Sequence, residues 1–332
     1  MKSRVSDDRF EKMIKISVII CTHNPRRDYL NRTLESLRNQ SLSKAEWELL
    51  VIDNQSKVPV KNILSADKGD NIRVVVETNL GLTPARNRGI EESRGDLLIF
   101  IDDDNVVDPN YLSRAMAIME DMPVLGCIGA GVLEPEFEEE PADSVRPYLR
   151  MLALRTVKET QWSNIPTDSI IPWGAGLVVR RNVAEKCRDK VKADSLLSIL
   201  DRKGSALNSG GDNEFTWTAC EMGYGKGLFL DLKIVHLIDR KRLQKPYLIK
   251  IAEGHAFSWG ISRWNHLRET PNIPSETSCF DIVRSIARLR VSEALSGIQK
   301  LIDRRHVDAF ASEIEAARIS GRKRALKLIK EN

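Results

Sequence analysis

Three consecutive carboxylates, Asp102, Asp103 and Asp104, directly follow a run of five apolar residues at positions 97–101. A short, bounded apolar run is typical of a strand buried on both faces of a parallel sheet. The acids would then lie at the carboxyl end of that strand, where open α/β sheets bind ligands. Adjacent carboxylates repel one another unless a cation or a donor-rich ligand lies among them, and Mg²⁺ is commonly held by carboxylates together with phosphate oxygens. The triplet therefore predicts a metal or nucleotide site, and a solvated acidic turn is the alternative.

Asp212 is the second residue with catalytic potential. It follows Gly210 and Gly211 and precedes a helical pattern that stops at Gly223. Residues 209–212 fit the S-x-x-D capping pattern, so one interpretation makes Asp212 a helix-capping acid. The other makes it a general base at the start of a helix, where the two glycines leave room for a substrate. The local sequence fits both interpretations.

A histidine, His236, lies in the apolar stretch 227–238, which is expected to be a strand. A lone histidine in such a stretch is more often a core residue than a metal ligand, and both interpretations stay open. Basic residues follow at 240–245, together with aromatic residues up to Trp259. They predict either the solvated face of a helix or a surface that contacts anionic lipid.

These residues need a scaffold, and the hydrophobic pattern predicts one. Strands are expected at residues 16–21, 48–53, 72–76 and 97–101. Helical patterns separate the strands, which favours a Rossmann-like βαβ sheet. The carboxyl ends of parallel strands meet at one edge of a sheet. The polar residues after the first, second and fourth strands would therefore lie together at the edge where a nucleotide binds.

Capping residues indicate where several helices begin. Thr83 followed by Pro84, and Asp108 followed by Pro109, are expected N-caps with a proline in the first turn. Other expected segments are a loop at 134–141, a strand at 171–180, a helix from 182 and helices at 282–301 and 318–329.

The expected sheet has no glycine-rich phosphate loop. The first strand is not followed by G-x-G-x-x-G, and G-x-x-x-x-G-K-[ST] occurs nowhere in the chain. A nucleotide on this sheet would therefore be held by carboxylates, a metal ion and an arginine.

The composition is that of a soluble globular protein, with 332 residues of which 42% are hydrophobic and 30% charged. The five cysteines are dispersed and form no CxxC pair. This argues against a disulfide framework and a structural zinc site, and for a reducing compartment. Residues 1–8 lack the apolar core of a signal peptide, and no run approaches the roughly 20 apolar residues of a transmembrane helix. We therefore expect a cytoplasmic protein, with attachment to the inner face of the membrane left open.

The formal net charge of +4 is concentrated near the end of the chain. Residues 281–332 hold twelve Lys and Arg against seven Asp and Glu. Nucleic acid is not expected as a partner, because no recognition motif with interleaved aromatic residues accompanies this charge.

Taken in order, five stretches resemble the family 2 glycosyltransferases of the GT-A fold. They are residues 17–25, 51–56, 79–89, 100–104 and 210–215. Their shared order and spacing make the resemblance specific. It implies an α/β GT-A fold: a Rossmann-like mixed, mainly parallel sheet flanked by helices, with a mainly helical C-terminal region.

The resemblance also implies a division of the chain, since it covers residues 14–240. The expected parts are an N-terminal extension at 1–13, a glycosyltransferase domain at 14–238 with a nucleotide-binding part at 14–108 and an acceptor part at 109–238, and a helical basic region at 239–332.

On the donor side, the resemblance implies roles for four residues before the triplet. Thr22 and Asn24 match the rim of the nucleotide pocket. Asp53 matches the acid that contacts the base of the nucleotide. Arg86 matches an arginine that lies near the base and the phosphates.

The triplet is similar to the DxD motif of that family. Asp102 would face the ribose or a metal-bound water, and Asp104 would ligate Mn²⁺ or Mg²⁺ on the diphosphate. Asp103 could share this work, because the triplet leaves the register ambiguous by one residue. His236 falls where some members of the family place a further metal ligand.

The resemblance makes Asp212 the catalytic base, although Gly211 departs from the common Gly-Glu-Asp context. It implies an inverting, metal-dependent transferase of the hexosyl class. The donor would be a nucleotide-diphosphate sugar, with a UDP-sugar favoured, and the acceptor a hydroxyl group. The basic C-terminal region suggests a lipid-linked glycan acceptor and peripheral membrane contact, in cell-surface glycan or polysaccharide synthesis.

Three other classes of protein fit parts of the sequence. Asp102-x-Asp104-x-Val106 matches the DxDx[TV] start of a HAD-like phosphatase, but that motif normally lies on the first strand of its domain. A nucleotidyltransferase would show a glycine-rich basic loop after the first strand, and residues 22–25 are not one. A non-catalytic sugar-binding scaffold with a vestigial site is the third, and the retained acids and Arg86 argue against it.

Overall fold

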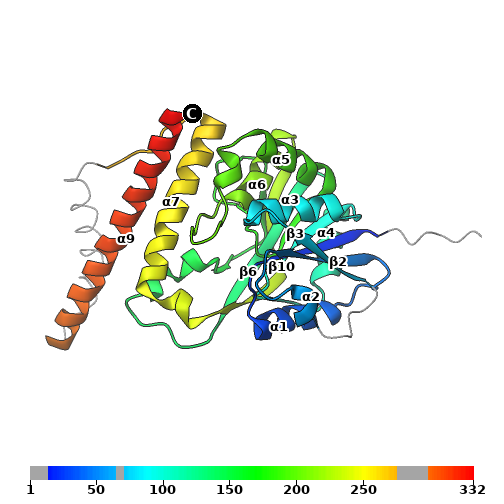
Figure 1. Cartoon of the computed structure of the whole chain (residues 1–332), viewed down its shortest axis with the longest axis horizontal. Helices are drawn as coiled ribbons and strands as arrows, with labels where there is room; N and C mark the ends of the chain where they lie inside the picture. Colours follow the sequence, from blue (N-terminus) through cyan, green and yellow to red (C-terminus); the bar gives the residue numbers. More distant parts are fainter. Residues whose placement is uncertain (1–13, 65–70, 275–297) are drawn as a thin grey trace, which may run out of the picture.

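The strands of the chain form one mixed sheet with helices on both faces (Figure 1). The computed structural model describes residues 14–64, 71–274 and 298–332. Within these ranges the sheet has ten strands in the order β3-β2-β1-β4-β9-β6-β10-β5, with β7 paired to β6 and β8 to β10. The α/β architecture expected from the sequence is confirmed.

One half of the sheet is parallel. Its strands, in spatial order, are β3 (Ile72–Glu77), β2 (Trp47–Asn54), β1 (Ile16–Thr22) and β4 (Leu97–Phe100). Every residue of β2 and β4 is buried, as expected of strands that are covered on both faces. Thr22 of β1 is in register with Asp53 of β2. The acidic triplet follows β4 at this same edge, so the polar ends of the first, second and fourth expected strands do lie together.

The other half of the sheet is mostly antiparallel. Its strands are β9 (Leu177–Arg180), β6 (Leu125–Phe137), β10 (Gly225–Ile238), β5 (Asn105–Val107), β7 (Arg155–Thr156) and β8 (Gln161–Ser163). Only β6 and β10 are parallel to each other among these pairs. The pairing of β10 with β5 places His236 opposite Asn105, the residue directly after the triplet. A histidine more than a hundred positions away thereby reaches the acids.

Two sets of helices cover the sheet. They are α1 (Arg27–Arg38), α2 (Val60–Ile63), α3 (Leu82–Glu92), α4 (Tyr111–Asp121), α5 (Arg181–Ala193), α6 (Gly211–Glu221), α7 (Lys245–Leu267) and α9 (Ile298–Glu331), with short 3-10 turns η1 (Arg146–Leu152), η2 (Leu197–Ile199) and η3 (Arg240–Leu243). Helices α1 and α4 bury apolar side chains on one face of the sheet, and α3, α5 and α6 do so on the other. The sheet is thus buried between two apolar layers.

Helices α7 and α9 lie side by side at one edge of the molecule (Figure 1). They run in the same direction, because Lys245 lies over Phe310 and Gly260 lies against Ala325. Phe257 of α7 and Ala325 of α9 join the apolar layer beneath α3 and α5. The described part of the region 239–332 is therefore helical and is packed onto the sheet domain.

Some expectations lie outside the described residues, namely the extension at 1–13 and most of the helix expected at 282–301. Over the ranges that are described, none of the helices has the length and apolar character needed to cross a bilayer. The helix expected at 318–329 lies within α9.

Two helices begin at other residues than expected. Helix α3 has Gly81 at its N-cap, with a φ of +138° that favours glycine. Thr83 lies inside the first turn, where its hydroxyl donates to the buried Asp201 (3.1 Å) and is not free to cap. Before α4, Asp108 accepts from the N–H of Asn110 (2.9 Å), so it caps a turn that precedes the helix. The expected caps at Thr83 and Asp108 were wrong, because Thr83 lies inside α3 and the backbone N–H that Asp108 accepts is that of Asn110, the N-cap residue of α4.

Three strand predictions also need correction. Strand β6 continues to Phe137, through half of the loop expected at 134–141, because it pairs with β10 along this stretch. Of the strand expected at 171–180, only Leu177–Arg180 forms, and several residues before it line a cavity instead. Strand β10 begins two residues earlier than expected, at Gly225.

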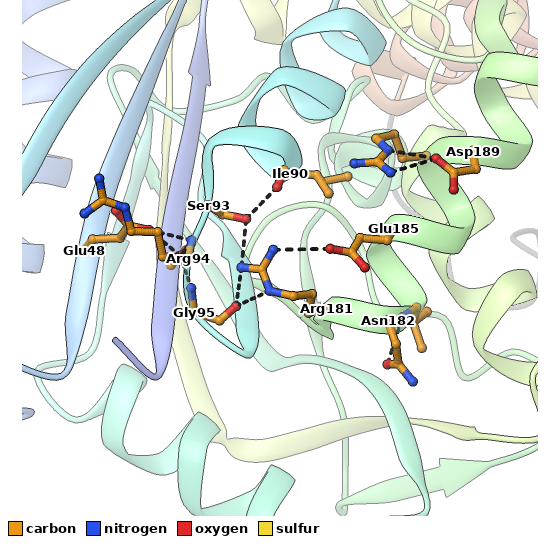
Figure 2. Close-up of polar contacts among 12 residues, drawn as sticks. Glu48, Ile90, Ser93, Arg94, Gly95, Arg181, Asn182, Glu185 and Asp189 are labelled. Carbon is orange, nitrogen blue, oxygen red and sulfur yellow. Dashed lines mark hydrogen bonds and ion pairs between the residues drawn. The ribbon is translucent and has the colours of Figure 1, made fainter. Parts of the chain in front are cut away.

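A polar network closes the turn between α3 and β4, at the end of the strands opposite the triplet (Figure 2). The Glu48 carboxylate accepts from the Ser17 hydroxyl (2.8 Å) and from the N–H of Arg94 (2.7 Å). The N–H of Gly95 donates to the Ser17 hydroxyl (2.8 Å), and the Arg181 guanidinium donates to the Gly95 carbonyl (2.8 Å). These bonds fix where β4 begins, and hence where the triplet emerges.

Gly95 leaves no space for a side chain in this network. A Cβ at this position would lie 2.5 Å from the carbonyl carbon of Ile16 and 2.6 Å from the backbone nitrogen of Ser17. Because backbone atoms of a central strand cannot yield, we expect Gly95→Ala to lower the free energy of unfolding by about 2 kcal/mol. Urea unfolding measures this, with exposed Ser205→Ala as the control; equal midpoints for Gly95→Ala and the unchanged protein would contradict it.

Candidate active site

A cavity of about 750 Å³ opens at the carboxyl ends of β1 and β4. Its lining includes residues from the sheet, from α3 and α6, and from the C-terminal helices. Seven residues singled out from the sequence line it: Thr22, Arg86, Asp102, Asp103, Asp104, Asp212 and His236. The fold therefore gathers groups from five separate stretches around one space, of the size of common ligand pockets.

Asn24 and Asp53 are not among the lining residues. The buried Asp53 carboxylate accepts from the backbone N–H of Val60 (2.8 Å). The Asn24 side-chain oxygen accepts from the N–H of Lys57 (2.8 Å). Both side chains hold the loop that follows β2, next to Asn54, which does line the cavity. The described geometry therefore gives these two residues a role in shaping the rim.

The triplet consists of three unlike carboxylates. Burial, together with the neighbouring charge of Asp104, raises the pKa of Asp102 and raises that of Asp103 to about 7. Asp103 also accepts a hydrogen bond from the Thr22 hydroxyl. Burial acts on Asp104 in the same direction, but the charges of His236 and Arg242 outweigh it and lower the pKa of Asp104. Asp104 is thus the carboxylate best suited to hold a cation.

Arg242 lies between Asp104 and His236. Its Nη1 is 2.6 Å from Oδ2 of Asp104 and 3.0 Å from Nε2 of His236, and this Oδ2 lies 3.3 Å from this Nε2. Sequence analysis missed this residue, because the basic cluster at 240–245 was interpreted only as a solvated or lipid-facing surface. The basic cluster could have suggested a charged partner for the triplet. Arg242 points to Asp104, however, only because η3 turns back toward the sheet.

The side chains around Arg242 are suited to bind a divalent metal ion next to Asp104. A carboxylate oxygen and an imidazole nitrogen converge on one cationic group, and these are donor types that Mn²⁺ accepts. In the described ranges, no cluster of three or more His, Cys, Asp or Glu side chains could hold a metal by itself. Two protein ligands completed by diphosphate oxygens would be an ordinary Mg²⁺ or Mn²⁺ arrangement. The residues therefore fit a metal that binds together with its nucleotide.

Asp212 lies at the start of α6 and faces the cavity. Its Oδ2 accepts from the backbone N–H of Gly174 (2.7 Å), and Oδ1 accepts from that of Asn213 (3.1 Å). A Cβ on Gly174 would lie 2.5 Å from Nη2 of Arg86 and 3.5 Å from Oδ2 of Asp212. Gly174 is therefore the place where the predicted base and the predicted phosphate-side arginine approach each other.

The capping interpretation of residues 209–212 is wrong. The N-cap of α6 is Gly210, and no side chain caps it. Ser209 instead donates its backbone N–H to the hydroxyl of Ser258 on α7 (3.2 Å). The S-x-x-D pattern failed because α7 packs against this loop, and it leaves the Asp212 carboxylate directed to Gly174.

Arg86 is buried and pairs with Asp201, with 2.9 Å between Nη1 and Oδ2. Burial opposes its charge, but the carboxylates of Asp201 and Asp212 raise the pKa of Arg86 above its ordinary value. A fixed cation therefore stands on the cavity wall between two acids. Asp201 was not among the residues singled out from the sequence, because no local pattern marks it.

The C-terminal helices form another part of the cavity wall. His255 and Trp259, one turn apart on α7, line it together with Arg318 of α9. Burial lowers the pKa of His255 to about 4, so this imidazole is neutral near pH 7. Trp259 is 41% exposed. Sequence analysis left Trp259 either on a solvated helix face or on a lipid-facing surface, and the described structure places it on the cavity wall.

A buried acid–histidine cluster ties α6 to α7 close to Asp212. Glu214 is 1% exposed and lies 2.8 Å from Nε2 of His266, whose Nδ1 lies 2.8 Å from Glu221. The imidazole also stacks on Trp217, with ring centroids 4.3 Å apart. Burial opposes its charge, but the hydrogen bonds to both acids raise the pKa of His266 above its ordinary value.

This cluster predicts a pH-dependent contribution to stability. The protonated imidazole stabilises the fold below the ordinary pKa of 6.5, and this stabilisation is lost as the pH rises through the raised value. We expect His266→Gln to cost about 3 kcal/mol at pH 6, because Glu214 loses its buried partner. The difference should shrink at pH 9. Urea unfolding at both pH values measures it, with exposed His23→Gln as the control; a difference that grows with pH would contradict it.

Comparisons with known proteins agree with this geometry. The family model described as glycosyl transferase family 2 matches residues 17–188. Glycosyltransferase AglE of Haloferax volcanii is 26% identical over 212 residues, which are 63% of this chain and 62% of AglE. The poly(ribitol-phosphate) beta-N-acetylglucosaminyltransferase TarS of Staphylococcus aureus is 29% identical over 137 residues, 38% of this chain and 24% of TarS. The chain thus spans less than two thirds of the length of each of these relatives.

A solved structure shares the fold. It is the mannosyltransferase PcManGT from Pyrobaculum calidifontis, described as a complex with GDP-Man and Mn²⁺. The match has a TM-score of 0.57 at 14% identity and covers 95% of this chain and 88% of that one. The expected GT-A fold is thereby confirmed.

Proposed function

This chain belongs to glycosyl transferase family 2, and we propose that it moves a sugar from a nucleotide-diphosphate sugar to a hydroxyl acceptor, with inversion at the anomeric carbon. The observation that carries the proposal is the convergence of Asp212, Arg86 and the acidic triplet on one cavity. No covalent nucleophile is required, because a single displacement from the opposite face inverts the sugar. We infer a role in glycan synthesis, with the hexosyl class favoured.

On the donor side, Thr22, Arg86 and Asp102 would contact the nucleotide, with Asp103 beside them. Asn24 would act at the rim through the loop that it holds, and Asp53, which the resemblance assigns to the base of the nucleotide, would act through the same loop because its carboxylate does not line the cavity. A UDP-sugar is the favoured donor, and the GDP-Man named for the Pyrobaculum structure makes a GDP-sugar the first alternative.

Asp104 and His236, with Asp102 nearby, are the residues that would hold Mn²⁺ or Mg²⁺. When bound, the ion would neutralise charge that develops on the diphosphate leaving group. The proposal is supported by the contacts that Asp104 and His236 now make to the Arg242 guanidinium. With a metal ion in its place, that guanidinium would pair with a phosphate oxygen of the nucleotide.

Asp212 would act as the general base. The acceptor hydroxyl gives its proton to the Asp212 carboxylate while its oxygen bonds to the anomeric carbon, and the bond from that carbon to the diphosphate oxygen breaks. The hydrogen bond from Gly174 orients the carboxylate for this transfer. The cavity wall of His255, Trp259 and Arg318 is where the acceptor would lie, because an aromatic ring and a neutral imidazole suit a sugar with hydroxyl groups.

Calorimetric titration with UDP, GDP, dTDP and CDP, first with Mn²⁺ and then with EDTA, tests this function. We expect one nucleotide to bind in a metal-dependent manner and so to name the donor class. Absence of binding under both conditions would contradict the proposal. Assays with phosphate esters would then examine the phosphatase alternative.

We also propose peripheral contact with the inner face of a membrane, close to a lipid-linked acceptor. Its support is the surplus of basic residues in 281–332, since each basic residue near anionic lipid contributes about 1 kcal/mol. Arg242, Trp259 and Arg318 do not contribute, because they line the cavity. Flotation with phosphatidylserine vesicles at low ionic strength should recover the protein with the vesicles. Protein that stays at the bottom of the gradient would contradict it, and neutral vesicles are the control.

A further inference from the structure

We infer that Asp201 is a positioning residue, which fixes both Arg86 and the amino end of α6 and thereby sets the direction of Asp212. The inference rests on the proposed transferase function. It assigns to this carboxylate a role that no local sequence pattern marks.

Asp201 connects two elements that carry site residues. It is only 6% exposed and lies in the loop after η2, between α3 and α6. One oxygen, Oδ2, accepts from Arg86 (2.9 Å) and from the Thr83 hydroxyl (3.1 Å). The other, Oδ1, accepts from the backbone N–H of Gly211, the first residue of α6 (3.1 Å). One carboxylate therefore uses each oxygen for a different wall of the cavity.

Gly211 is a glycine because of Asp201. A Cβ at position 211 would lie 2.5 Å from Cγ of Asp201, inside the space that the carboxylate occupies. The backbone does not require glycine here, since Gly211 is not among the glycines with a left-handed φ. A side chain at position 211 and the carboxylate of Asp201 would therefore occupy the same volume. In this protein the Asp201 carboxylate occupies it.

The contacts of Asp201 lead to the base along two routes. In the first, Gly211 is bonded directly to Asp212, so the hydrogen bond to Gly211 places the backbone of the base. In the second, Arg86 packs against Gly174, whose N–H holds the Asp212 carboxylate (2.7 Å). Without the Asp201 charge, the buried guanidinium would lose its ion pair and shift against Gly174. A misplacement of about 1 Å can cost a hundredfold in rate.

The first test uses unfolding alone and does not depend on any sugar substrate. In the unchanged protein, Gly211→Ala should lower the urea midpoint, because the new Cβ meets the Asp201 carboxylate. With Asp201→Gly already present, the same change should leave the midpoint unchanged or raise it, because Ala is a better helix residue than Gly. Equal losses in both backgrounds would overturn the claim that the two positions share one volume.

The second test separates positioning from stability. Asp201→Asn keeps the shape of the side chain and removes its charge, and exposed Asp231→Asn is the matched control. We expect Asp201→Asn to lower kcat about a hundredfold and the affinity for the nucleotide by less, about tenfold, because the displaced Arg86 would also contact the nucleotide. Circular dichroism at the assay temperature establishes that the variant is folded. A kcat within twofold of the unchanged enzyme would overturn the inference.

A double variant tests the shared volume by its effect on the rate. Asp201→Gly combined with Gly211→Glu returns a carboxylate to the shared volume from the other side. We expect it to regain at least tenfold of the kcat lost in Asp201→Gly. If the unchanged protein binds no nucleotide and transfers no sugar, the proposed function fails, and the unfolding comparison still decides whether residues 201 and 211 share their space.

Discussion

Replacement of Asp212 by Asn is expected to lower the rate of sugar transfer about a thousandfold, because an amide cannot accept the proton of the attacking hydroxyl. The variant should fold normally. Its side-chain oxygen can still accept the N–H of Gly174 (2.7 Å), and only the longer hydrogen bond from the N–H of Asn213 (3.1 Å) is lost. The lower rate would therefore reflect the loss of a proton acceptor, because the side chain keeps its shape and its position.

The measurement that checks this is kcat at saturating donor, with the Kd of the nucleotide determined by calorimetry. We expect the Kd to change less than threefold, because the proposal assigns Asp212 to the acceptor hydroxyl and not to the nucleotide. Asp231→Asn, the same change at an exposed position, is the control. A variant that keeps more than a tenth of the normal kcat would exclude Asp212 as the general base.

The second large effect is expected at Asp104. Asp104→Asn should weaken nucleotide binding in Mn²⁺ about a hundredfold, since loss of one ligand or of its supporting charge removes most of the metal affinity. Asp104 is the carboxylate in contact with both His236 and Arg242. With EDTA present, the variant and the unchanged protein should bind the nucleotide equally weakly.

The contrast between the two titrations identifies the metal as the cause. Asp108→Asn is the matched control, because Asp108 lies four positions later and does not line the cavity. Removal of one charge from the pair with the partly buried Arg242 also affects folding, so the melting temperature is recorded for each variant. Unchanged affinity in Mn²⁺ would assign the metal site to Asp102 or Asp103 instead.

The sequence by itself determined the parallel half of the sheet and the edge at which the site lies. Strand β4 and the position of the triplet could be predicted because a strand buried on both faces needs a continuous apolar run. That run, at residues 97–101, is visible in the local sequence. The same local logic placed Thr22 beside the end of β2. The family resemblance then supplied the base, since Asp212 alone fitted a cap as well as a catalyst.

Only the tertiary structure decided which polar groups meet. Arg242 reaches Asp104 across 138 positions, and Asp201 reaches Arg86 across 115. No local pattern encodes such pairs, because they depend on how η3 and the loop before α6 pack. The same packing overturned the cap expected at Thr83, whose hydroxyl bonds Asp201. A local sequence pattern shows which hydrogen bonds a segment could make by itself. In the fold, a buried charged partner such as Asp201 determines which of them form.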